Sequence, residues 1–242
     1  MTREGQQRRP DATLDAVSGE RAPASSRWRA SPARLLRLLV GLSVFGAGEA
    51  CLVAARLGNS PWTVLSEGVA LHTPLSIGVA TIAIGAAVLL AWLPLQERVG
   101  LGTVANTVVI GLALDATLLV LPEPQGLPAR WALLLTGIAV VGLGSGLYLT
   151  AGLGPGPRDG LMTGLTRVTG RPLGLVRSTL EVSALVAGVL LGGTAGLGTL
   201  AFALLIGPAV ATGVRLCGGV DKVTGVAAES ASRVGSPESR AA

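Results

Sequence analysis

Four charged side chains interrupt the long apolar stretches of the sequence: Glu49, Asp115, Arg177 and Glu181. A charge at the centre of a bilayer costs roughly 2.5–3.5 kcal/mol on insertion scales, so it normally faces a bundle interior or a water-filled cavity. These four residues are therefore candidates for ion coupling. Glu49 and Asp115 have no oppositely charged neighbour in the sequence. Asp115 lies 14 residues into its apolar stretch and Glu49 lies near the end of its own, so Asp115 is our first choice for a proton or cation site, with Asn106 sharing its cavity.

Arg177 and Glu181 are spaced four positions apart, which places them on one face of a helix. The simpler interpretation is a structural ion pair that neutralises itself inside the membrane. The alternative is that Arg177 reaches Glu49 or Asp115 across a helical bundle.

Two short segments, 61–70 and 157–168, each begin with a proline after a turn that contains glycine. Proline suits the first turn of a helix, so each segment predicts a helix that is too short to span a bilayer. If the two helices re-enter the membrane from opposite faces, their N-terminal amides would meet a polar or anionic substrate near the midplane. The candidate substrate-binding residues are Arg56, Gly58, Pro61, Gly154, Pro157, Arg158 and Asp159. The alternative is two interfacial helices, with Trp62 as an aromatic anchor.

The composition is that of a membrane protein. Only 14% of the residues are charged, against roughly 25% in an average soluble domain. Residues 38–216 hold 15 of the 33 charges, and the two ends hold the other 18. This distribution excludes an ordinary soluble enzyme and a disordered chain. Two cysteines and one histidine exclude a disulfide framework and a metal-ligand set, so we expect no metal, no cofactor and no catalytic residues.

Six apolar stretches reach the length of about 20 residues that a helix needs to cross a bilayer. They are 38–55, 75–95, 101–121, 131–153, 173–191 and 197–214. Their hydrophobicity is continuous rather than alternating, which excludes β-barrel strands. The ends, 1–34 and 217–242, are predicted to be disordered tails, and 122–130 is predicted to be a linker loop.

The basic residues predict how the chain sits in the membrane. With six spans, one side receives both termini and 17 of the 19 basic residues, and the other side receives Arg56 and Arg130. Cytoplasmic segments carry the excess of lysine and arginine, so both termini are expected to be cytoplasmic and the protein to lie in the cell membrane. The net charge of +5 therefore indicates membrane orientation and not nucleic-acid binding.

The chain contains an internal repeat. Residues 41–111 align with 137–207 without a gap, and 22 of 71 positions are identical, where chance would give about 7. Each copy, 35–121 and 131–216, holds three spans. Three is odd, so the second copy is expected to be inverted relative to the first, as in secondary transporters. The alternative is a duplication that only builds a stable bundle.

Three motifs carry a resemblance to a known family: Leu-Gly-x-x-Pro-Trp at 57–62, Gly-Leu-Gly-Pro-Gly-Pro-Arg-Asp-Gly-Leu-Met at 152–162, and Gly-Leu-Gly-Thr at 100–103 and again at 196–199. The chain resembles the YczE/YyaS/YitT family of bacterial integral membrane proteins, and its YczE branch most closely, over about residues 35–216. The resemblance implies a multi-pass membrane fold and no defined activity. Thr63 stands where the family often has an acidic residue, which argues against a catalytic role for position 63.

These observations predict an all-α polytopic membrane protein of two inverted three-helix repeats, each with a short re-entrant or interfacial helix after its first span. The predicted function is transporter-like, with the lipid bilayer and a small polar or anionic solute as partners. The alternative is a non-transporting scaffold or regulator of a neighbouring pathway. An intramembrane enzyme is not expected, because His72 stands alone. The sequence leaves a homo-oligomer open.

Overall fold

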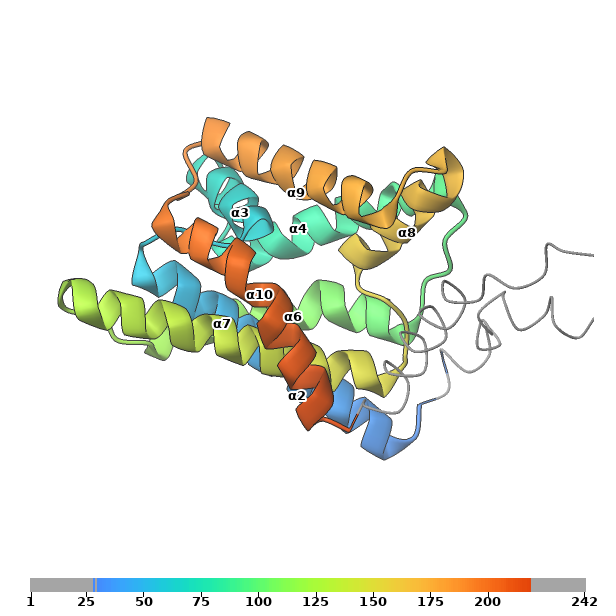
Figure 1. Cartoon of the computed structure of the whole chain (residues 1–242), viewed down its shortest axis with the longest axis horizontal. Helices are drawn as coiled ribbons and strands as arrows, with labels where there is room; N and C mark the ends of the chain where they lie inside the picture. The colour runs from blue at the N-terminus through green and yellow to red at the C-terminus, as the bar shows by residue number, and fades with distance from the viewer. Residues whose placement is uncertain (1–27, 29, 219–242) are drawn as a thin grey trace, which may run out of the picture.

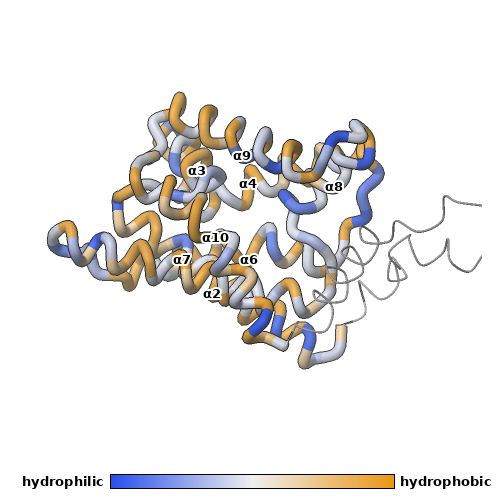
Figure 2. Tube along the Cα trace, in the orientation of Figure 1, coloured by the Kyte–Doolittle hydropathy of each residue, from blue (hydrophilic) through white to orange (hydrophobic). Residues whose placement is uncertain are grey.

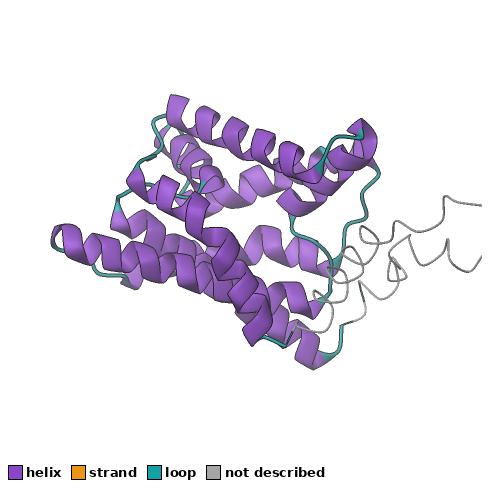
Figure 3. Ribbon diagram, viewed as in Figure 1, coloured by secondary structure: helices purple, strands orange, loops and turns teal. Residues whose placement is uncertain are grey.

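The structure is a computed structural model of the chain that describes residue 28 and residues 30–218. Within that part of the chain every regular element is a helix (Figures 1 and 3). The elements are α2 (Pro32–Ala55), α3 (Pro61–Leu71), α4 (Ile77–Leu90), α5 (Trp92–Leu95), α6 (Leu101–Val120), α7 (Gly126–Ala151), α8 (Pro157–Thr169), α9 (Leu173–Leu190) and α10 (Leu197–Leu216). The predicted tails fall largely outside the described residues.

Six of these segments are long and apolar enough to cross a membrane: α2, α4 together with α5, α6, α7, α9 and α10. Figure 2 shows them as largely hydrophobic. The six predicted spans are therefore confirmed, although α2 and α7 begin several residues earlier than expected. In α2 the early start is set by Pro32 in the first turn and by the Ser31 hydroxyl, which accepts a hydrogen bond from the Arg34 backbone N–H at 3.4 Å.

The outer surface of the bundle is suited to lipid contact. Large apolar side chains on it are strongly exposed, as is expected where the surrounding solvent is hydrocarbon rather than water. Among them, Leu93, Leu119, Val120, Leu190 and Leu216 are each at least 74% exposed.

The start of α2 and the end of α10 lie at the same end of the bundle. The Arg37 guanidinium donates a hydrogen bond to the Cys217 carbonyl at 3.1 Å. The two short helices lie toward opposite ends, with α3 on the left and α8 on the right of Figure 1. An even number of spanning helices places the start of α2 and the end of α10 at the same end of the bundle.

Helices α2 and α7 are the most buried of the six spans and approach each other closely through glycines. A Cβ atom added at Gly144 would lie 2.5 Å from the Phe45 backbone nitrogen, and one added at Gly48 would lie 2.7 Å from the Val141 nitrogen. Gly48 and Gly144 are 96 positions apart, so the two copies of the sequence repeat meet here at equivalent positions. Small residues at such crossings allow backbones to pack directly in a membrane.

Replacing Gly144 with alanine is expected to lower the free energy of unfolding by about 1–3 kcal/mol, because backbone atoms of α2 would have to move to accept the methyl group. Thermal unfolding of the purified chain in detergent measures the change. Gly207→Ala in α10 is the matched control, because a Cβ there meets no described atom within 4 Å. Equal effects of the two substitutions would contradict close packing at the α2–α7 crossing.

Candidate functional site

The turns that precede α3 and α8 are each held by the opposite half of the chain. The Leu57 carbonyl accepts a hydrogen bond from the Gly198 N–H at 2.7 Å, at the start of α10. The Leu153 carbonyl accepts one from the Gly102 N–H at 2.9 Å, at the start of α6. The two short helices therefore begin at positions fixed by the N-termini of two spanning helices.

The first turns of α3 and α8 meet inside the bundle. Each helix begins with a proline, Pro61 or Pro157, and the next residues are Trp62 and Arg158. The guanidinium carbon of Arg158 lies 4.9 Å from the centroid of a Trp62 ring, within the range of a cation–π interaction. Trp62 and Arg158 are also 96 positions apart, so this contact joins equivalent positions of the two sequence copies.

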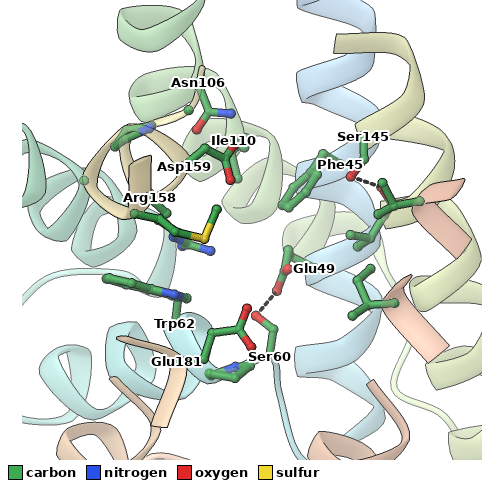
Figure 4. A pocket seen from close by; sticks show the side chains of 18 of the residues that line it. Phe45, Glu49, Ser60, Trp62, Asn106, Ile110, Ser145, Arg158, Asp159 and Glu181 are labelled. Carbon is green, nitrogen blue, oxygen red and sulfur yellow. Dashed lines mark hydrogen bonds between the residues drawn. The ribbon is translucent and has the colours of Figure 1, made fainter. Parts of the chain in front are cut away.

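A cavity of about 460 Å³ lies beside this contact (Figure 4). Both copies of the repeat line it, and 20 of its 29 lining residues form ten pairs that are 96 positions apart. These pairs are Phe45 and Val141, Glu49 and Ser145, Ser60 and Gly156, Pro61 and Pro157, Trp62 and Arg158, Thr81 and Arg177, Ile84 and Leu180, Gly85 and Glu181, Asn106 and Phe202, and Ile110 and Ile206.

Glu49 contributes a carboxylate to one wall of the cavity and is only 2% exposed. Its Oε2 atom accepts hydrogen bonds from the Ser60 hydroxyl at 2.9 Å and from the Thr63 hydroxyl at 2.7 Å. Within the described residues, no hydrogen bond is formed by Oε1. The turn before α3 and the first turn of α3 therefore orient this acid and leave one of its oxygens available.

Arg158 and Asp159 approach the same space from α8, across from Glu49 (Figure 4). The Tyr148 hydroxyl donates a hydrogen bond to Asp159 Oδ2 at 3.2 Å. The Arg158 guanidinium forms neither a hydrogen bond nor an ion pair within 4.0 Å in the part of the chain that is described. Its stacking on Trp62 leaves the N–H groups free to bind an anionic group, for which a guanidinium offers paired donors.

Arg177 and Glu181 complete the charged lining of the cavity. The Arg177 Nε and Glu181 Oε1 atoms are 3.0 Å apart, so the predicted ion pair is confirmed. Their side chains are 56% and 41% exposed. The bonded partner of Arg177 is thus Glu181 and not Glu49 or Asp115.

The structure brings seven of the predicted site residues to one cavity: Glu49, Pro61, Pro157, Arg158, Asp159, Arg177 and Glu181. It places the other four elsewhere.

Asp115 lies outside the cavity, where its side chain connects α6 to the start of α4. Its Oδ1 atom accepts the Gly78 N–H at 2.8 Å, and its Oδ2 atom accepts the Ser76 hydroxyl. It therefore holds the start of α4 against α6. Asn106 was expected to share a cavity with Asp115, but Asn106 lines this cavity and Asp115 does not.

The turns before α3 and α8 contain the three remaining predicted residues, Arg56, Gly58 and Gly154. Arg56 ends α2 with a φ of 53° and forms an exposed ion pair with Glu123 at 2.7 Å. Gly58 and Gly154 have φ values of 117° and 119°, which glycine adopts readily. A Cβ on Gly58 would also lie 2.6 Å from the Gly196 nitrogen. None of these three residues lines the cavity.

Sequence reasoning missed the hydroxyl partners of the acids, Thr63 and Tyr148. One signal was present: Thr63 and Asp159 are equivalent positions of the repeat, and so are Glu49 and Ser145. The first copy has the acid on its spanning helix and the hydroxyl on its short helix, and the second copy has the reverse.

Comparison with known proteins places the chain in a family. Residues 32–214 match the "Family of unknown function (DUF6198)". The chain belongs to this family. It is 46% identical over 187 residues to an uncharacterized protein of Haemophilus influenzae, covering 77% of this chain and 86% of that protein. It is 34% identical over 183 residues to the uncharacterized membrane protein YczE of Bacillus subtilis, covering 75% of this chain and 82% of the relative.

The resemblance to the YczE branch is thus confirmed, and the matched region holds all six candidate spans up to the last turn of α10. The family and the six apolar helices together make the protein a multi-pass membrane protein. No solved structure matches the chain.

Proposed function

We propose that the protein is a transporter of the cytoplasmic membrane that moves a small polar or anionic solute by alternating access. In this proposal the two halves are inverted repeats, both termini are cytoplasmic, and α3 and α8 are re-entrant helices that meet at a central solute site. The cavity lined by ten equivalent pairs supports this arrangement. The observation that carries the proposal is a difference between the halves at one equivalent pair of glycines.

In the first half, α4 and α6 are packed together at Gly78 and Gly111. A Cβ on Gly78 would lie 2.1 Å from the Gly111 carbonyl oxygen, and a Cβ on Gly111 would lie 2.4 Å from the Gly78 oxygen. We call this line of contact between the two helices the seam, and in the first half it is closed. Asp115 stabilises it by accepting a hydrogen bond from the Gly78 N–H.

In the second half, the equivalent glycines are Gly174 of α9 and Gly207 of α10, and this seam is open. A Cβ added at either glycine meets no atom of the described residues within 4 Å. Gly207 lines the cavity, as do Arg177 and Glu181, so the cavity reaches this seam. Ala211 stands at the position equivalent to Asp115, so this half lacks the carboxylate that ties the seam of the other half.

The equivalent seams are thus closed in one half and open in the other. Alternating access by inverted repeats requires such a difference, because exchanging the conformations of the two halves moves the opening to the other side of the membrane. With cytoplasmic termini, α9 begins at the cytoplasmic face, and the present conformation is open to that side. In the opposite conformation Gly174 approaches Gly207 while Gly78 separates from Gly111.

A disulfide between Gly174→Cys and Gly207→Cys tests this exchange, in a chain with Cys51 and Cys217 replaced by serine. A disulfide requires Cβ atoms about 3.5–4.5 Å apart, whereas in the open seam a Cβ at either position meets no described atom within 4 Å. We expect an oxidant to link the pair in native membranes, as measured by loss of both maleimide-reactive thiols. Gly174→Cys with Leu205→Cys is the control, because position 205 lies on the opposite face of α10 from 207. If both thiols of the first pair stay reactive, the seam does not close and the proposed mechanism is wrong.

A further inference from the structure

We infer that the solute is a zwitterion, with a carboxylate bound by Arg158 and an ammonium group bound by Glu49 and Asp159. This inference rests on the proposed transporter function and names the substrate class of the same cavity.

The charges that line the cavity favour a ligand with both signs. Three acids and two arginines line it. Arg177 and Glu181 are paired with each other at 3.0 Å. Arg158 is left between Glu49 and Asp159, which gives these three groups a formal charge of −1 when all are ionised.

Each of these three groups retains unused bonding capacity in the described part of the chain. Glu49 receives both of its hydrogen bonds on Oε2, and Asp159 receives the Tyr148 hydroxyl on Oδ2. The Arg158 guanidinium is stacked on Trp62 but forms no hydrogen bond. Charged groups withdrawn from bulk water are costly unless they are paired. A ligand with one ammonium and one carboxylate supplies partners for all three.

A ligand with a single charge leaves part of the site unsatisfied. A monoanion on Arg158 would face two carboxylates, and like charges that share a site of low dielectric repel strongly. A monocation beside Glu49 and Asp159 would balance their formal charge of −1 with Arg158, but it would leave the guanidinium without a hydrogen-bonded anionic partner. Only the zwitterion complements both signs.

The aromatic residues add a second observation. The sequence has only seven aromatic residues, and four of them line this cavity: Phe45, Trp62, Tyr148 and Phe202. Arg158 stacks on Trp62. The rings of Phe45 and Tyr148 pack edge to face, with their centroids 6.3 Å apart, and Tyr148 bonds to Asp159. Aromatic faces attract ammonium and quaternary ammonium groups.

The test measures binding of glycine betaine, choline and acetate to the full chain in lipid nanodiscs. Choline and acetate each present one of the two charges of glycine betaine. L-alanine, as a fourth probe, distinguishes a primary from a quaternary ammonium within the same class. We expect at least one zwitterion to bind about 10-fold or more tightly than choline and acetate, because it meets both the acids and Arg158, whereas choline and acetate each meet groups of one sign only. Acetate or choline binding as tightly as both zwitterions, or no binding by any probe, overturns the inference.

Glu49→Gln keeps the shape of the side chain and removes its charge. We expect it to weaken zwitterion binding about 10-fold and to strengthen acetate binding. Glu123→Gln is the matched control and should change neither, because Glu123 is exposed and bonded to Arg56 outside the cavity. Unchanged binding of both probes to Glu49→Gln would remove Glu49 from the site.

Counterflow of the same probes in proteoliposomes separates this inference from the proposed function. A zwitterion that binds but is not exchanged across the bilayer contradicts transport and leaves the ligand class standing. Exchange of acetate without exchange of either zwitterion contradicts the ligand class and leaves transport standing.

Discussion

Replacing Arg158 with glutamine is expected to weaken binding of glycine betaine about 100-fold and to strengthen binding of choline, because a positive charge beside the choline cation is removed. The guanidinium is the unpaired cation of the cavity lining, since Arg177 is bonded to Glu181. Loss of a bidentate charge-assisted contact with a carboxylate corresponds to about 3 kcal/mol, which is about 100-fold in affinity. Choline has no carboxylate, so it does not use this contact.

Arg158→Lys is the control for charge alone. Lysine retains the positive charge but has neither the planar paired donors nor the same stacking on Trp62, so an intermediate loss is expected. Calorimetry in nanodiscs gives the affinities of the three proteins for both probes. Glycine betaine binding that is the same in Arg158→Gln as in the natural chain would show that the carboxylate binds elsewhere.

The second large effect is expected at Glu67, which ties α3 to the turn between α9 and α10. Its Oε2 atom accepts the Thr194 N–H at 2.7 Å and the Asn59 amide at 2.8 Å. Its Oε1 atom accepts the Thr194 hydroxyl at 2.9 Å. Glu67→Ala leaves these partly buried donors without a partner, and each such loss costs about 1–3 kcal/mol. We therefore expect the free energy of unfolding to fall by about 3 kcal/mol or more.

Glu67→Gln is the matched control for this position. Its amide oxygen can accept the two bonds made to Oε2, and its amide nitrogen can donate to the Thr194 hydroxyl. Tryptophan fluorescence during thermal unfolding compares the two variants. A glutamine variant as unstable as the alanine variant would show that the negative charge, rather than the hydrogen-bond acceptors, stabilises the contact.

The spans and the starts of the short helices could be predicted because the signals are local. Hydrophobic runs of about 20 residues identify spanning helices in any fold. Pro61 and Pro157 mark the first residues of α3 and α8, as expected for proline at a helix start. The ion pair of Arg177 and Glu181 could be predicted from the sequence in the same way, since residues four positions apart share a helix face.

The ranking of the acids could not be predicted from their depth in a span. Asp115 was favoured for its position, but its side chain caps the start of α4, and its two partners lie 37 and 39 residues away in the sequence. Glu49 lies closer to the end of its span, yet the turn before α3 folds back and covers it with Ser60 and Thr63. The direction in which a side chain faces depends on packing between helices, and no local sequence pattern predicts that packing. Glu67 escaped notice for the same reason, since Thr194 is 127 residues away.

The turns at Leu57 and Leu153 have a consequence for how the protein is made. Helices α2 to α6 are synthesised first, but the Leu57 carbonyl then lacks its partner, because Gly198 lies 141 residues later in the chain. If α3 enters the hydrocarbon as proposed, an unpaired carbonyl there is costly, so we expect α3 to reach its final position only after α10 has been inserted. The reciprocal bond from Gly102 to Leu153 can form earlier, as soon as the fourth span is in place. We therefore expect α8 to take its final position before α3 during biogenesis, and insertion of α10 to complete the fold.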